Sequence, residues 1–414
     1  MSAHDPLTRR GIPKDADLRA FAIGSFVTRF GGGAVMSTSA IYFTRHLGFS
    51  AAEVAGALSL AGLAALLVTL PAGQLGDRFG AREVLTWLMT GLAVATPLPV
   101  LARNPIALAG LLGLEAALAS ASGSVRNGLI AQLATGGRGV AFKAYLRAVT
   151  NSAIALGSLA GGGALLVDRD AAYVAVFVGA GVLTALAAWN TTRLTHVPPR
   201  PPVAGEPRLA VLRDRPFVAT ILATGVFSLH FVAMDLGIAL FIAQRTAAPT
   251  VMIAILLLLN TVAVAGLQVR FSRSSDTVRS GGHELVRGGL LVAAGFVVIG
   301  FAEGMPPALA GGLLVAGALV HVAGELLGSG GVWAIQMGLA PHERQGQYQG
   351  FASLNFTLMH VVGPPVVTLL CVQHGRLGWV LMGSVVLAGS LAAQRLSRWA
   401  LGERAAYGVT THSG

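Results

Sequence analysis

The stretch Gly73-Gln-Leu-Gly-Asp77-Arg78-Phe-Gly80-Ala-Arg82-Glu83 joins two long apolar runs and decides how the rest of the chain is interpreted. Its glycines predict a tight turn and a close approach of the flanking helices. Asp77, Arg78 and Arg82 place both signs of charge at the expected edge of a membrane, where such groups pair or bind helix ends. Taken alone, the pattern predicts a solvated, charged loop that sets the orientation of the chain.

The composition indicates a polytopic membrane protein. Of the 414 residues, 54% are hydrophobic and only 11% are charged, whereas soluble proteins contain about 25% charged residues. Glycine is abundant, which favours the close helix packing found in lipid. The formal net charge of +11 comes from basic residues scattered through short loops, without a basic face. We therefore expect a lipid bilayer around the chain and no nucleic-acid partner.

Twelve apolar runs are long enough to cross a bilayer, which requires about 20 apolar residues. The predicted fold class is an all-α membrane protein in which consecutive helices are antiparallel neighbours. The predicted spans are 18–43, 51–72, 83–102, 105–127, 144–167, 171–191, 216–243, 248–269, 285–303, 306–333, 347–371 and 376–396.

The distribution of basic residues predicts the orientation. Most arginines fall in the tails, the central segment and every second loop, so the positive-inside rule places both termini in the cytoplasm. We expect no cleaved signal peptide, because the N-terminal residues lack a short apolar core. The arginine, alanine and glycine bias suggests a bacterial source, and hence a bacterial cytoplasmic membrane.

The proline-rich segment 192–215 is expected to be a cytoplasmic linker between two six-helix halves, residues 1–191 and 216–414. A weak repeat relates these halves. Residues 133–138 align with 339–344, and the opening stretch has a degenerate counterpart around Asp276. Glu115 and His321 are separated by the same interval as the aligned segments. Two related halves with a site between them are typical of transporters.

The pattern Gly-x-x-x-Asp-Arg-x-Gly-x-Arg after the second apolar run resembles the loop signature of the major facilitator superfamily of transporters. One departure is Glu83, which stands where the signature usually has a second basic residue. The resemblance implies twelve transmembrane helices in two pseudo-symmetric six-helix bundles, with a monomer sufficient for transport. It also implies a set of gating residues, which are Gly73, Asp77, Arg78, Gly80, Arg82, Arg126, Arg147 and Asn151.

Two more specific expectations concern residues of the gating set. We expect Asp77 to cap the N-terminus of the eleventh helix near 345–348, and so to latch an outward-facing state. Arg126, Arg147 and Asn151 are expected to cluster as gate and packing residues. For Arg126, snorkelling of the side chain to the membrane surface is an equal alternative.

Ionisable residues inside apolar spans are costly, by about 2.5–3.5 kcal/mol on insertion scales, and usually face the bundle interior. By the resemblance, helices one, four, seven and ten line a central cavity, and these helices hold every acidic residue placed well inside a span. The candidate residues for substrate binding and proton coupling are Arg29, Glu115, His230, Asp235, His321, Glu325 and His360.

Structural alternatives exist for most of these candidates. A carboxylate at Glu115 suits proton exchange, but it could instead form a buried ion pair with Arg29. Asp235 could be a solvated interfacial carboxylate. Glu325, one turn after His321, could be the partner of that histidine. His230 and His360 could be hydrogen-bonded packing residues.

Two family patterns differ in this chain. Many proton-coupled exporters of the superfamily carry an arginine in the middle of helix four, where this chain has Glu115. The antiporter signature of helix five contains a Gly-Pro pair, whereas residues 157–163 contain no proline. A Gly363-Pro364-Pro365 kink occurs at the matching point of helix eleven. The resemblance therefore covers the whole chain for the fold and only suggests antiport.

The sequence contains no enzyme signature. Lysine never follows glycine, so the chain lacks a nucleotide-binding phosphate loop. Its histidines show no metal-ligand spacing. We expect no catalytic residues, no metal, no cofactor and no nucleotide.

The favoured function is proton-coupled efflux of a small amphipathic compound, such as a drug or a natural product. The alternatives are symport or facilitated uptake of a sugar, organic acid or peptide, and a receptor or membrane enzyme on the same scaffold.

Overall fold

The computed structural model describes residues 13–134, 137–199 and 209–407, and these residues are almost entirely helical. The predicted all-α fold class is confirmed. The long helices are α1 (Ala16–Ile41), α2 (Ala51–Phe79), α3 (Ala81–Ala95), α4 (Pro105–Leu133), α5 (Gly137–Val167), α6 (Asp170–Thr191), α7 (Arg215–Val232), α9 (Val251–Phe271), α10 (Val278–Gly300), α11 (Pro307–Leu339), α12 (Gln345–Val367) and α13 (Gly375–Gly402). A π-helical turn, η4 (Ala233–Gly237), joins α7 to the short helix α8 (Ile238–Arg245).

Each of the twelve predicted spans overlaps one of these helical segments, with ends that differ by a few residues. Among the described residues, eleven helical segments are long and apolar enough to cross a membrane. The helix α1 is not one of them, because Arg29 and several glycine, serine and threonine residues lower its mean hydropathy. Many large apolar side chains point outward, for example Leu67, Leu159 and Leu166. Such an apolar exterior is expected where lipid is the solvent.

The opening stretch differs from the sequence expectation. It was expected to be a loop, but α2 continues to Phe79 and α3 begins at Ala81, so only Gly80 separates the two helices. Gly80 has φ 95°, a conformation that disfavours residues with a side chain. The polar residues extend the helix beyond the apolar run, because a helix satisfies its own backbone hydrogen bonds in water as well as in lipid.

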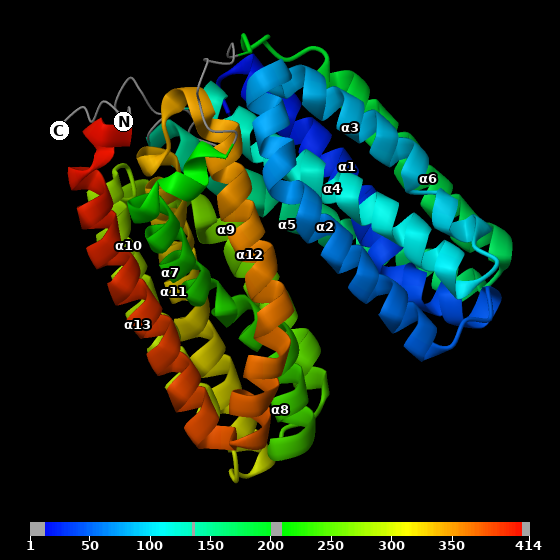
Figure 1. The fold of residues 1–414 in the computed structure, drawn as a ribbon. Coiled ribbons are helices and arrows are strands. Elements are labelled where there is room, and N and C mark those ends of the chain that lie inside the picture. The colour runs from blue at the N-terminus through cyan, green and yellow to red at the C-terminus, as the bar shows by residue number, and fades with distance from the viewer. Residues whose placement is uncertain (1–12, 135–136, 200–208, 408–414) are drawn as a thin grey trace. The chain divides into compact units, whose positions relative to one another are not determined.

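The chain forms two compact units (Figure 1). The first comprises residues 1–134, 145–209 and 342–354, and the second comprises 135–144, 210–341 and 355–414. Each unit thus includes a short segment from the other half of the sequence, at the start of α12 and of α5 respectively. The expected linker over 192–215 falls partly outside the described residues.

In the first unit, α2 packs along α4, α1 along α6, and α3 against both α4 and α6. An apolar cluster at one end is built around Tyr42, Phe43, Tyr173 and Phe177. These side chains fix the π-helical turn η1 (Tyr42–His46), which follows α1, against the start of α6.

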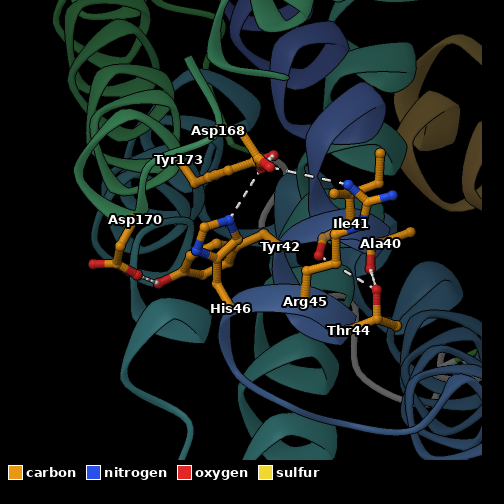
Figure 2. A network of polar contacts seen from close by, with 9 residues as sticks. All are labelled: Ala40, Ile41, Tyr42, Thr44, Arg45, His46, Asp168, Asp170 and Tyr173. Atoms are coloured by element: carbon orange, nitrogen blue, oxygen red, sulfur yellow. Dashed lines mark hydrogen bonds and ion pairs between the residues drawn. The ribbon is translucent and has the colours of Figure 1, made fainter. Parts of the chain in front are cut away.

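A polar network closes the same end of the first unit (Figure 2). The Asp168 carboxylate, between α5 and α6, accepts a hydrogen bond from the Tyr173 hydroxyl at 2.8 Å and lies 3.2 Å from the His46 ring. The Tyr42 hydroxyl donates to Asp170 at 3.2 Å. The Tyr173 hydrogen bond is the largest cause that lowers the pKa of Asp168. The network therefore fastens the end of α1 to the α5–α6 connection.

In the second unit, α10 packs along α11 and α13, and α13 also packs along α7. Near the start of α7, the Arg404 guanidinium forms a bidentate ion pair with Asp214 at 2.7 and 2.8 Å. Neither side chain is accessible to solvent. Asp214 also caps α7 by accepting from the backbone N–H of Phe217. This buried pair connects the last helix to the first helix of the unit.

Candidate functional site

Asp77, near the end of α2, caps the N-terminus of α12. Its two carboxylate oxygens accept the backbone N–H groups of Gly346 and Gln347 at 2.8 and 2.7 Å. The first N–H groups of a helix have no partner within the helix, and the partial positive charge there favours an anion. The predicted contact between Asp77 and this helix end is confirmed, and both partners belong to the first unit. Its role as a latch stays a prediction.

Glycines allow α2 and α12 to approach closely enough for this contact. A Cβ on Gly73 would overlap the carbonyl oxygen of Gly346, and a Cβ on Gly346 would overlap that of Gly73. From the other side, a Cβ on Gly128 of α4 would lie 2.6 Å from the Gly346 Cα. The backbone of α12 at Gly346 is therefore held between two helices of the first unit.

The remaining residues of the opening stretch have local roles. Arg82 bonds to Glu83 at 2.7 Å and donates to the carbonyl oxygen of Leu194 at 2.9 Å. Glu83 also lies 2.9 Å from a ring nitrogen of His196. Glu83, the departure from the family signature, thus links the start of α3 to the segment after α6. Arg78 is exposed, with its guanidinium over the ring of the neighbouring Phe79.

The second unit contains a counterpart of the Asp77 region. Asp276, which follows α9, lies beside Gly137, the first residue of α5. A Cβ on Gly137 would be 2.8 Å from the Asp276 carboxylate. This placement agrees with the weak repeat in the sequence, which pairs the two aspartates and the two helix starts.

A cavity of about 100 Å³ lies within the first unit, between α1, α3, α4 and α6. Two cations, Arg29 of α1 and Arg126 of α4, line it and are close enough to repel one another. The rest of the lining combines apolar walls with small polar groups: Phe21, Leu85, Met89, Leu92, Ala119, Gly24, Gly123, Ser25, Thr28, Ser122, Asn190 and Thr191. Mostly apolar walls with a few polar groups are typical of small-molecule sites, whose volumes of about 300–1,000 Å³ exceed that of this cavity.

Arg126 was expected to cluster with Arg147 and Asn151. The structure places Arg126 in the lining of the same cavity as Arg29, and the expected cluster stays a prediction. Arg147 and Asn151 lie one turn apart on α5, and the described cavity lining includes neither. The pairing of Arg29 with Arg126 was not predicted, since the two belong to different helices and carry the same charge.

Glu115 continues the face of α4 that lines the cavity. The lining residues Ala119, Ser122 and Arg126 follow it at helical spacing. Glu115 is half-buried, and among the described residues no ion pair joins it to Arg29. The alternative of a structural Glu115–Arg29 pair is therefore not realised.

In the second unit, the sequence candidates His230 of α7 and His321 and Glu325 of α11 come together. His230 Nδ1 lies 3.1 Å from His321 Nε2, and His321 Nδ1 lies 3.8 Å from Glu325 Oε2. The expected pairing of Glu325 with His321 is thus observed. All three side chains are almost fully buried. Asn260 of α9, which was not among the residues predicted from the sequence, donates its amide N–H to Glu325 Oε2 at 2.9 Å.

Two further candidates lie apart from this cluster. Asp235 is exposed in the π-helical turn η4. His360 is exposed on α12, where its ring packs at a tilt against Phe356 and contacts the Phe356 carbonyl oxygen at 3.0 Å. The packing alternative therefore describes the observed surroundings of His360. Asn260 could have been noticed because it directly follows the apolar run 251–259 within the predicted span 248–269.

Comparison with known proteins agrees with the architecture. The family pattern of the Major Facilitator Superfamily matches residues 21–364. No functionally curated protein matches the chain by sequence.

Solved transporter structures share the fold at low sequence identity. A bacterial homologue of the iron transporter ferroportin, solved in an outward-facing state, is 17% identical with a TM-score of 0.71, covering 94% of this chain and 100% of its own. The human organic anion transporter MFSD10 (TETRAN) is 13% identical, with a TM-score of 0.67 over 91% of this chain and 98% of its own. The proton:xylose symporter XylE is 13% identical, with a TM-score of 0.61 over 95% of each chain. At these identities the likeness establishes the fold alone.

Proposed function

Because the chain belongs to the Major Facilitator Superfamily, we propose that it is a proton-coupled secondary transporter that exports a small amphipathic compound across a bacterial cytoplasmic membrane. The cavity would be exposed alternately to the two sides of the membrane. The observation that carries the proposal is the cavity of the first unit, with two arginines set in a largely apolar wall.

The charge of this cavity indicates the class of compound. Arg29 and Arg126 repel one another, and among the described residues neither forms an ion pair with an acidic side chain. A carboxylate, sulfonate or phosphate group placed between them would relieve that repulsion and form charge-assisted hydrogen bonds. The walls formed by Phe21, Leu85 and Met89 would contact an apolar body. The proposed cargo is therefore an amphipathic organic anion.

Glu115 is the proposed proton carrier. It lies on the same face of α4 as Arg126, eleven residues away, which corresponds to about 16 Å along the helix. At that distance, with an effective dielectric constant of about 20, two unit charges interact by about 1 kcal/mol. Direct electrostatic coupling of the proton to the anion is too weak to drive accumulation. Proton binding and anion binding would instead be coupled because each changes the relative stability of the conformations in which the cavity is open to one side of the membrane or the other.

The test uses full-length protein in proteoliposomes with a panel of fluorescent amphipathic anions, cations and neutral compounds. We expect counterflow of anions, which Arg126→Gln and Arg29→Gln reduce at least tenfold. Arg45→Gln is the matched control, because Arg45 is an exposed arginine of η1 outside the cavity, 4.0 Å from Asp168. Equal transport of cations by wild type and Arg126→Gln would overturn the assignment of the cargo.

The Glu115→Gln variant tests proton coupling separately from binding of the cargo. We expect this variant to retain counterflow and to lose transport driven by a pH gradient. Full pH-driven transport by Glu115→Gln would remove Glu115 from the mechanism. Imposing the pH gradient in both orientations shows the direction of transport relative to the protons. Efflux by proton exchange requires that the compound accumulate on the acidic side. Accumulation on the alkaline side would show uptake by symport instead.

A further inference from the structure

We propose that His230, His321 and Glu325 form a binding site for one divalent transition-metal ion. One ligand atom from each residue can be chosen so that all three lie within 4.8 Å of one another. Two imidazole nitrogens and a carboxylate oxygen suit zinc and its neighbours in the first transition row. The spacing of the sequence could not reveal the site, because α7 supplies one ligand and α11 supplies the other two.

The ligand geometry is close to that of a bound ion. Two nitrogens at about 2.0–2.1 Å from a tetrahedral zinc ion are about 3.3 Å apart, and His230 Nδ1 lies 3.1 Å from His321 Nε2. His321 and Glu325 are one helical turn apart on the same face of α11. Glu325 Oε2 lies 3.8 Å from Nδ1 of His321, whereas His230 Nδ1 lies 3.1 Å from Nε2 of the same ring. One ion binds a single nitrogen of His321, so side-chain rotation must bring the third ligand atom, which is within 4.8 Å, to that nitrogen and leave a fourth position for water or another donor.

Neighbouring side chains hold the ligands in place. The Asn260 amide donates to Glu325 Oε2 at 2.9 Å, which orients the carboxylate from α9. The Phe296 ring stacks on His321 with centroids 5.3 Å apart, and Phe227 and Phe231 pack against His230. Outer partners of this kind fix the orientation of metal ligands in known sites.

Charge also favours a cation here. The buried Glu325 carboxylate accepts from Asn260 and lies 3.8 Å from His321. A divalent ion bound by neutral imidazoles would add a positive charge beside this carboxylate. The site lies wholly in the second unit, and it goes beyond the proposed transport function, whose cavity belongs to the first.

The test measures zinc binding by the detergent-purified full-length protein, carrying an affinity tag without histidine and stripped with a chelator. Equilibrium dialysis against radioactive Zn²⁺ allows for slow exchange at a buried site. We expect one saturable Zn²⁺ per chain. His321→Gln and Glu325→Gln should weaken binding at least tenfold, and Asn260→Ala about tenfold. His360→Gln is the matched control, because His360 is an exposed histidine outside the cluster.

Two outcomes would overturn the proposal: absence of saturable binding, or binding that His321→Gln and Glu325→Gln leave unchanged. Gel filtration and thermal melting without metal check that each variant folds. If the variants do not fold, X-ray absorption of Zn²⁺-loaded wild type tests the site instead. Two imidazole ligands on the zinc would support the site, and the absence of imidazole ligands would refute it. Arg126→Gln should keep full Zn²⁺ binding, so failure of the transport proposal is distinguishable from failure of this one.

Discussion

The carboxylate of Asp77 lies at the N-terminus of a helix that begins far away in the sequence, with one oxygen 2.8 Å from the backbone nitrogen of Gly346. The other oxygen accepts from the next backbone N–H, at Gln347. Helix caps usually come from the residue just before the helix. Here the cap comes from α2, so a helix-capping interaction connects two helices that only the tertiary fold brings together.

Asp77→Asn is expected to slow transport of every substrate alike and to leave the affinity of the cavity ligand mostly unchanged. An asparagine amide offers one acceptor oxygen where two N–H groups need partners, and it removes the negative charge. Hydrogen bonds to charged groups are worth about 1.5–3 kcal/mol each. Transport rates for several compounds and equilibrium ligand binding check this. Asp15→Asn, which alters the cap of α1 on its own helix, is the control. Loss of binding for one compound only would contradict the prediction.

Gly73→Ala is expected to destabilise the first unit by about 1–3 kcal/mol, the cost of overpacking a tight contact. The added methyl group would overlap the carbonyl of Gly346, and neither backbone can move without disturbing the Asp77 cap. Gly62→Ala is the matched control on the same helix, since a Cβ there meets nothing within 4 Å. Thermal melting in detergent compares the two variants. Equal melting temperatures would show that the close approach at Gly73 is not essential.

Arg404→Met is expected to lower the stability of the second unit by about 3–5 kcal/mol, because it leaves the buried Asp214 carboxylate without its counter-charge. Adding Asp214→Asn should recover part of the loss, since the charge disappears while an acceptor for the Phe217 N–H remains. Arg398→Met, at an exposed arginine of α13, should have little effect. Thermal melting of the three variants measures this. A double variant less stable than Arg404→Met would contradict the explanation.

Protonation of Asp168 is expected to make the stability of the folded protein depend on pH. The Tyr173 hydrogen bond, followed by that of His46, lowers the pKa of Asp168 in the folded protein. A lowered pKa means that the folded state favours the carboxylate. The stabilisation that the Asp168 carboxylate contributes is therefore fully present above the pKa of an unfolded aspartate, about 3.9. It is lost as the pH falls through the pKa of Asp168 in the folded protein.

The test of this dependence is the difference in melting temperature between wild type and Asp168→Asn as a function of pH. Asparagine suits the backbone at this position, whose φ is 44°. We expect a difference above pH 4 that shrinks on further acidification. A difference that stays constant down to pH 2 would show that the Asp168 network does not contribute through its charge.

The helical character of the apolar runs could be predicted from the sequence because lipid leaves few options for the backbone. Apolar runs of sufficient length must form helices there, and every predicted span overlaps a helical segment. The ends of the helices were less predictable. The opening stretch was expected to be a loop, yet glycines that suggest a turn in solution lie within α2, where Gly73 packs against Gly346.

The sequence by itself determined which residues carry unusual chemistry, because a charge or an imidazole inside an apolar span is costly and stands out from its neighbours. Arg29, Glu115, His230, His321 and Glu325 were all found in this way. Only the tertiary structure decided their partners. Arg29 and Arg126 line the same cavity, and His230 meets His321 from another helix. Helical periodicity fixes the face of a residue within its own helix, but the neighbours on that face depend on how the helices pack.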